Sequence, residues 1–334
     1  MIDQGPLEQL FDSLTPPVGF GAAAYAVRPL AETNSCLIGK DSSSLACLLI
    51  ANSGEPPTTH APIRLEAIDV QFDLRCTVRE TSQAAPARTG NFTVVRCRST
   101  EPEIVRYFLT ICEVIVRLVG TDATAGTVST AIARMAALFQ KRSAAPSRMV
   151  NGLFGELWII SASRDPVATL SCWRLDSSAR FDFAQKNLRL DVKTTTGRLR
   201  VHTVSFDQCN PPPQTCAVLA SMFVERLASG ISLRTLIQDI ETKVSSSPEL
   251  LLKLHEVVAD SLGASLQDGL ETRFDNHLAQ SSLQFFDALE VPAIRGPLPA
   301  GVGDVHFRSD FSTCEPTPVR TWRERNPLFA ALLP

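Results

Sequence analysis

The segment from Phe181 to Thr196 constrains this chain most, because its residues alternate as in two short strands joined by a polar turn at residues 185–187. Successive side chains of a strand point to opposite faces. The second strand therefore has an apolar face and a charged face. The apolar face carries Leu188, Leu190 and Val192, and the charged face carries Arg189, Asp191 and Lys193. The pattern predicts a hairpin with one face in the core.

Two further acids lie near this charged face. Asp182 is on the first strand and points away from Phe181 and Phe183, so acids and a lysine on neighbouring strands can form a cation site. Glu156 lies on a helix predicted from about Ser147 to Ser163. A glutamate on that helix's apolar face is costly unless it meets a cation, a metal or a hydrogen-bond donor. A buried arginine partner remains an alternative to a metal.

This arrangement, D-x(8)-D-x-K on a hairpin after a helical glutamate, resembles the catalytic core of the PD-(D/E)XK nuclease superfamily. The stretch from GLFGELW (152–158) through DVKTTT to Gln208 is similar to bacterial PD-(D/E)XK motif proteins encoded near restriction and phage-defence genes. The close resemblance covers roughly residues 151–240. Phe181 stands where the family name has proline, and Asp191 is the shorter of the two acids that the motif allows.

The resemblance implies an α/β (α+β) fold with a restriction-endonuclease-like core, in which helices flank a mixed central sheet. It implies a Mg²⁺-dependent endonuclease that hydrolyses DNA in a bacterial restriction or anti-phage system, with Mn²⁺ able to substitute. The alternatives are a catalytically inactive scaffold that binds nucleic acid or a partner protein, and a nuclease acting on RNA or branched DNA. DNA, other proteins of a defence operon and a second copy in a homodimer are the partners implied.

The same resemblance assigns roles to individual residues. Its catalytic set is Glu156, Asp182, Asp191 and Lys193. Mg²⁺ would be held by Asp182, Asp191 and the Val192 carbonyl, with Glu156 binding a second ion or a metal-bound water. Lys193, expected on an exposed strand face, would orient the attacking water or stabilise developing charge. Gln208 would contact the metal ligands and not the metal ion itself. Phosphate contacts are expected from Thr194, Thr195, Arg198 and Arg200.

Charge is distributed unevenly along the chain. The formal net charge is −3, which argues against a grip on nucleic acid by the molecule as a whole. Residues 141–205, however, contain eleven Lys or Arg and five Asp or Glu, a local charge of +6. A basic segment around the candidate site suits a polyanionic substrate. Arg198, Arg200 and His202 share a face of a strand predicted over residues 198–206, where His202 is expected at the surface.

The remaining patterns suggest three regions. Residues 1–145 read as a β-rich region with two helices, of unknown role; residues 146–262 form the nuclease core; residues 263–334 form an extension with strands and a proline-rich tail. Nine cysteines lack the spacing of a disulfide framework, and the N-terminus lacks an export signal, so we expect a cytoplasmic protein. No apolar run approaches the roughly 20 residues that span a bilayer, so no membrane partner is expected.

Overall fold

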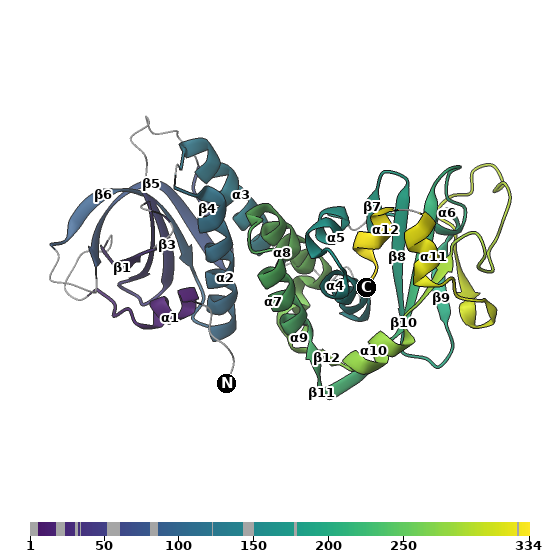
Figure 1. Ribbon diagram of the computed structural model, residues 1–334. Coiled ribbons are helices and arrows are strands. Elements are labelled where there is room, and N and C mark those ends of the chain that lie inside the picture. Colours follow the sequence, from purple (N-terminus) through teal and green to yellow (C-terminus); the bar gives the residue numbers. More distant parts are fainter. Residues whose placement is uncertain are drawn as a thin grey trace. The chain divides into compact units, whose positions relative to one another are not determined.

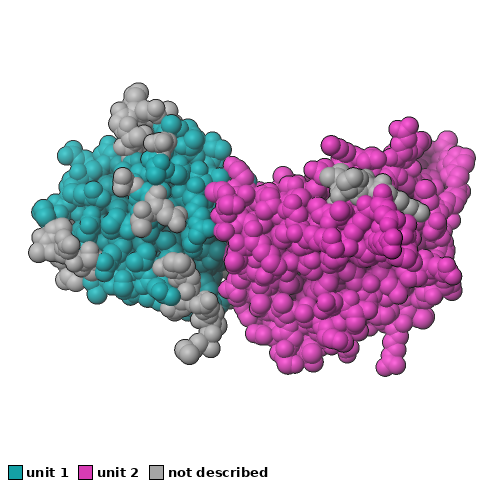
Figure 2. All heavy atoms as spheres, in the orientation of Figure 1, with its two compact units in different colours: residues 1–143 teal, residues 144–334 magenta. Residues whose placement is uncertain are grey.

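The computed structural model describes residues 6–17, 24–30, 33, 35–51, 61–80, 86–121, 123–142, 150–176, 179–325 and 327–334 (Figure 1). The chain forms two compact units, residues 1–143 and 144–334, coloured separately in Figure 2. The division falls close to the junction placed near residue 145 from the sequence. The predicted helix start around Ser147 lies outside the described residues. None of the helices described is long and apolar enough to cross a membrane.

The first unit is a curled β-sheet with helices packed against it. Its strands are β1 (Ala24–Pro29), β2 (Cys36–Asp41), β3 (Ala46–Ala51), β4 (Ile63–Arg64), β5 (Ile68–Glu80) and β6 (Arg88–Cys97). Because β1 pairs with β2 on one side and, in parallel, with β5 on the other, five strands close into a ring. An apolar cluster that includes Tyr25, Leu49 and Phe92 fills it. The helices are α1 (Pro6–Asp12), α2 (Pro102–Val119) and α3 (Ala125–Arg142). This confirms the β-rich region with two helices, to which the structure adds the short α1.

The second unit is built on a four-stranded mixed sheet, in the order β13 (Gln284–Asp287), β10 (Cys216–Phe223), β8 (Leu188–Thr195) and β7 (Phe183–Gln185). Strand β8 runs parallel to β10 and antiparallel to β7, while β13 is antiparallel to β10. A second pair, β9 (Val201–Ser205) with β14 (His306–Asp310), is antiparallel. This is the mixed sheet with flanking helices expected of a restriction-endonuclease-like α+β fold.

The other elements of this unit are mostly helical. They are α4 (Val150–Ala162), α5 (Pro166–Cys172), α6 (Phe206–Cys209), α7 (Leu233–Lys243), α8 (Pro248–Leu262), η1 (Gly263–Ser265), α9 (Leu266–Glu271), α10 (Asn276–Ser282), η2 (Phe311–Thr313), α11 (Val319–Arg325), α12 (Pro327–Leu332) and the paired short strands β11 (Arg226–Ser232) and β12 (Arg273–Phe274). Where the sequence predicted a proline-rich tail, α11 and α12 form and bury Trp322 against Phe329. Pro327 begins α12, a position that tolerates proline because its missing N–H has no helical acceptor.

Helix α4 packs closely on β8 because of a glycine. A Cβ added at Gly155 would lie 2.6 Å from Thr194 Cγ2 and 3.0 Å from Val192 Cγ1, closer than side-chain atoms normally approach. The motif GLFGELW therefore presses its second glycine against the central strand. Residues 153–160 of α4 are all buried, which explains why the segment is apolar around its whole circumference. The close approach also fixes Glu156, the next residue, near the sheet.

The predicted hairpin forms as β7 and β8. Gln185 pairs with Leu188 across a two-residue turn, in which Lys186 adopts a φ of 51° in the left-handed region. Asp182, expected on the first strand, lies in a bend immediately before β7. Strand β7 is thus short, and beyond it the backbone of β8 is accessible to the Asp182 side chain.

Candidate active site

Asp191 and Lys193 form the centre of the candidate site. They lie two residues apart on β8, and Lys193 Nζ is 2.8 Å from Asp191 Oδ2. The side chains are 6% and 17% exposed, so the charged face is mostly buried rather than exposed as expected. Burial alone would lower the pKa of Lys193, but the carboxylates of Asp191 and Asp182 outweigh it and raise that pKa. Lys193 is therefore a fixed cation at neutral pH.

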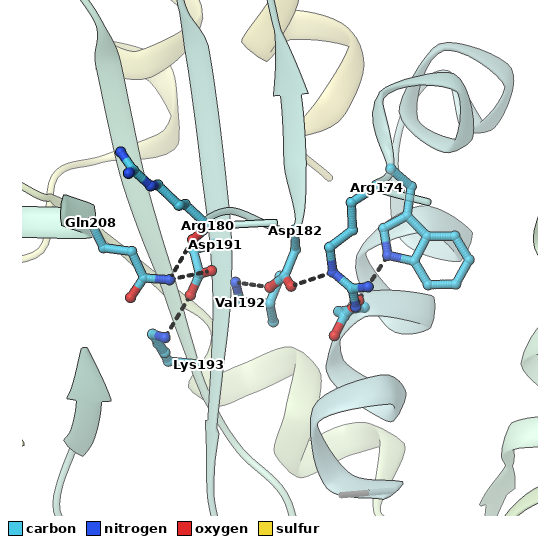
Figure 3. A network of polar contacts seen from close by, with 9 residues as sticks. Arg174, Arg180, Asp182, Asp191, Val192, Lys193 and Gln208 are labelled. Carbon is cyan, nitrogen blue, oxygen red and sulfur yellow. Dashed lines mark hydrogen bonds and ion pairs between the residues drawn. The ribbon is translucent and has the colours of Figure 1, made fainter. Parts of the chain in front are cut away.

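Gln208 holds Asp191 from the side opposite to Asp182 (Figure 3). Its side-chain Nε2 donates to Asp191 Oδ1 at 2.8 Å and to the Arg180 carbonyl at 2.7 Å. Its Oε1 accepts from the Ser205 backbone N–H, while Ser205 Oγ accepts from the Gln208 N–H, which makes a capping box at the start of α6. The helix cap thus orients the amide so that its donor faces the carboxylate.

Asp182 reaches the edge of β8 where β7 has ended. Its Oδ2 accepts a hydrogen bond from the Val192 backbone N–H at 2.8 Å. The N–H and C=O of one strand residue point to the same edge, so the Val192 carbonyl, the predicted third ligand, is directed to the side on which Asp182 lies. In Figure 3 the carboxylates of Asp182 and Asp191 lie at the same level of β8, one toward Arg174 and one toward Gln208.

Glu156 is held by the two residues that follow α5. Trp173 Nε1 donates to Glu156 Oε2 at 2.8 Å, and Arg174 Nη2 donates to the same oxygen at 2.7 Å. Arg174 Nε also donates to Asp182 Oδ1 at 3.2 Å, so one guanidinium joins two carboxylates. The Arg174 and Glu156 side chains are each 3% exposed. The arginine partner, left open as an alternative from the sequence, is present.

The donor set fits a hard divalent cation in part. Mg²⁺ is commonly bound through one or two carboxylates while it keeps several waters, and Asp182 and Asp191 supply two such groups on adjoining segments. Within the part of the chain that the structure describes, no group of three or more His, Cys, Asp or Glu side chains could hold a metal ion. Glu156, predicted as a further ligand, instead contacts Trp173 and Arg174.

The residues predicted to contact phosphate are placed differently from one another. Arg198 is exposed, and Thr195, partly buried, accepts the Gly197 N–H with its hydroxyl. Thr194 packs toward Gly155, on the α4 side of the sheet. Arg200 is buried, and its guanidinium donates to Ser221 and to a backbone carbonyl of α10. A phosphate contact by Arg200 does not agree with this placement, because an internal network already engages its guanidinium.

His202 is also buried, in contrast to its expected surface position. Its Nε2 lies 2.8 Å from Ser221 Oγ, and Ser221 pairs with Lys193 between β10 and β8. Burial, with the positive charges of Lys193 and Arg200, lowers the pKa of His202 to about 4. His202 is therefore neutral at pH 7 and contacts the residue that pairs with Lys193. Sequence reasoning overlooked Ser221, Trp173 and Arg174; the signal for Arg174 was the glutamate on a buried helix that required a cation.

The PD-(D/E)XK class of cores is defined by a helix that bears a glutamate, packed on a mixed sheet with D-x-K on a central strand and a further acid at the start of the adjoining hairpin. The chain belongs to the family described as "Putative PD-(D/E)XK family member, (DUF4420)", whose model matches residues 8–312. The match covers most of both units. Comparison with curated proteins gave no match, and comparison with solved structures gave none either.

Proposed function

We propose that this protein is a divalent-cation-dependent nuclease that hydrolyses phosphodiester bonds of DNA. The observation that carries the proposal is the pairing of Asp191 with Lys193 on β8, with the Asp182 carboxylate bound at the intervening residue. Membership of a PD-(D/E)XK family supports it, because the resemblance to nucleases of that class implies a cation held by the two acids beside a lysine.

In this proposal Asp182 and Asp191 hold the cation. When bound, Mg²⁺ or Mn²⁺ supplies Lewis acidity and lowers the pKa of a bound water. Lys193, kept protonated by its neighbours, orients that water or stabilises charge developing on the phosphate. Gln208 orients the Asp191 carboxylate, because the capping box fixes the Gln208 amide with its N–H directed at Asp191.

The substrate contacts that we propose come from two exposed arginines and from the partly buried Thr195. The Arg180 side chain is 69% exposed and forms a surface ion pair with Asp207, and the Arg180 carbonyl accepts from Gln208, which places this residue beside Asp191. Arg198 and Thr195 follow the D-x-K segment on the same strand or just after it. Such contacts to phosphate carry no base information, and their contribution to affinity falls as salt increases.

Cleavage of plasmid DNA by the full-length protein tests the function. We expect nicking or linearisation with Mg²⁺ or Mn²⁺, none with chelator, and none in Asp191→Asn or Lys193→Met. Lys253→Met is the matched control, because Lys253 lies on α8, outside the hairpin that carries Asp191 and Lys193, and donates to the Ser171 carbonyl. Retention of cleavage by a folded Lys193→Met would remove the lysine from the reaction. Equal amounts of a matching RNA in the same assay separate the two substrates.

One observation favours a second function, a scaffold that binds nucleic acid without cutting it. Arg174 pairs with both Glu156 and Asp182, and Lys193 pairs with Asp191, so all three candidate acids are ion-paired within the protein. A scaffold of this kind would shift DNA in an electrophoretic assay yet leave it intact at all Mg²⁺ and Mn²⁺ concentrations. Binding without cleavage in the wild type would make the scaffold the better assignment.

A role in a restriction or anti-phage system is the finer part of the proposal and rests on the family resemblance. It predicts that expression of the chain, with the neighbouring genes of its operon, lowers phage plating, and that Asp191→Asn abolishes the effect. Equal plating with wild type and Asp191→Asn would separate the enzyme from defence. Light scattering with and without DNA would test a homodimer.

A further inference from the structure

We propose that Arg174 is a built-in cation of this site, which keeps Glu156 out of the metal set and positions Asp182, so that the site binds one divalent cation and not two. The inference rests on the proposed function and concerns the number of metal ions and the role of an arginine outside the D-x-K pattern.

The first argument is geometric. Arg174 uses Nε for Asp182 Oδ1 and Nη2 for Glu156 Oε2, two donors that the planar guanidinium holds in a fixed relation. Its backbone N–H donates to the Asp182 carbonyl at 2.9 Å. Arg174 is therefore attached to Asp182 through both main chain and side chain. These two contacts hold Asp182 in its position beside Val192 of β8.

The second argument concerns the Glu156 carboxylate. Oε2 accepts from Trp173 Nε1 and from Arg174 Nη2, which together match the two lone pairs of one carboxylate oxygen. A metal ion at Oε2 would have to displace one of these bonds, and a metal ion at Oε1 would place a second positive charge beside the Arg174 guanidinium, which like-charge repulsion disfavours. The pair is 3% exposed on both sides, and removing one partner of a buried ion pair carries a large penalty. Glu156 thus acts as the anchor of Arg174.

The third argument is that a guanidinium supplies positive charge between the two carboxylates but none of the chemistry of a metal ion. Arginine stays protonated at all relevant pH values, so the charge between Glu156 and Asp182 is permanent. Unlike a metal ion, it supplies no site for an activated water. An activated water would then have to come from the one cation that Asp182 and Asp191 would hold.

Titration calorimetry of the full chain with Mn²⁺, without DNA, provides the test. We expect one ion per chain in the wild type and in Glu156→Gln, which keeps an oxygen to accept from Arg174. Asp182→Asn, the matched amide substitution, should weaken binding by about tenfold or more, the scale on which loss of a supporting or ligating group reduces metal affinity. Two ions in the wild type would refute the inference, as would a loss in Glu156→Gln as large as that in Asp182→Asn.

Removal of the arginine gives the converse result. Arg174→Ala leaves two carboxylates facing a cation-sized vacancy, so we expect two Mn²⁺ ions per chain, and one in Glu156→Gln/Arg174→Ala. A folded Arg174→Ala that still binds a single ion would count against the inference. If Arg174→Ala does not fold, the wild-type and Glu156→Gln stoichiometries still decide the question.

Positioning by Arg174 is tested separately from stoichiometry. Arg174→Lys keeps the charge but offers no fork, so it should retain one-ion stoichiometry while kcat falls and KM for DNA stays the same. A purely structural role predicts a lower folded fraction with unchanged kcat per folded molecule. Absence of any metal binding in the wild type would refute the metal-dependent nuclease as well; failure of the Glu156 and Arg174 variants alone refutes only this inference.

Discussion

Replacement of Lys193 by methionine is expected to destabilise the second unit strongly, although a lysine on an exposed strand would contribute little. The structure places Lys193 Nζ 2.8 Å from Asp191 Oδ2, with side chains only 17% and 6% exposed. Methionine has a similar length and no charge, so it leaves the Asp191 carboxylate buried with Gln208 as a donor but without its cation.

The magnitude follows from the burial of the pair. Two unit charges at this separation attract by roughly 6 kcal/mol at an effective dielectric constant of about 20, and desolvation of both groups offsets much of that. Loss of one partner of a buried pair typically costs about 3–5 kcal/mol. Because the pair retains some exposure, we expect about 3 kcal/mol for Lys193→Met, a fall in Tm of roughly 6–12 °C for a unit of this size.

A double-mutant cycle isolates the pair. Asp191→Asn alone should also cost about 3 kcal/mol, since it leaves the Lys193 ammonium buried without its carboxylate. The double variant leaves neither charge buried without its partner, so Asp191→Asn/Lys193→Met should cost about 3–4 kcal/mol rather than the sum of about 6 kcal/mol. A coupling energy of about 2–3 kcal/mol is expected, within the range for residues in contact.

Tryptophan fluorescence is the assay that suits this chain. All three tryptophans, Trp158, Trp173 and Trp322, lie in residues 144–334, and all three are buried. Urea titration followed by their emission therefore reports unfolding of the second unit without a contribution from tryptophan in the first. A free energy of unfolding for Lys193→Met within about 0.5 kcal/mol of the wild-type value, the usual range for surface changes, would refute the energetic importance of the buried pair.

Three further predictions use the same protein. Gly155→Ala should destabilise the second unit by about 1–2 kcal/mol, because its Cβ meets side chains of β8. Gly152→Ala should stabilise α4 by about 0.5–1 kcal/mol, because its Cβ enters open space. Urea midpoints that move in the same direction for the two variants would contradict the packing of α4 on β8. The pKa of His202 is lowered to about 4, so its contribution is complete above pH 6.5 and is lost as pH falls from 6.5 towards 4. His202→Gln should remove about 3 kcal/mol of that acid dependence, which unfolding at pH 7 and pH 4.5 would measure. Arg198→Ala should lower the salt dependence of DNA binding by about one counterion, and an unchanged slope would exclude Arg198 from the interface.

The parts of the site that the sequence predicted are those set by a local period. Alternation along β8 placed Asp191 and Lys193 on one face, and the two-residue turn placed Asp182 near them. The contact of Gln208 with Asp191 also follows from the resemblance, and the capping box that orients Gln208 is itself a local pattern. Local backbone geometry was sufficient to predict the positions of these residues, because few strand registers are compatible with a tight turn and one apolar face.

The parts that the sequence did not predict depend on pairing between distant segments. The periodicity of α4 does not identify which arginine pairs with Glu156. Arg174 and Arg200 each count as one positive charge in the sequence, and only the structure shows that they are buried in two different networks. Strand β5 gives another case. A bulge between Gln71 and Leu74 shifts its register with β6, and no local period of the sequence indicates where such a shift occurs.

The burial of these arginines changes how the basic character of residues 141–205 should be understood. Six of its charged groups are buried or nearly so and sum to zero: Glu156, Arg174, Asp182, Asp191, Lys193 and Arg200. The local charge of +6 therefore belongs entirely to the other residues of the segment, Arg180 and Arg198 among them. Under the proposed function, attraction of a polyanion and chemistry at the site would thus be performed by separate sets of side chains. Neutral substitutions within the buried set should abolish cleavage without changing the salt dependence of DNA binding, because they remove no exposed cation.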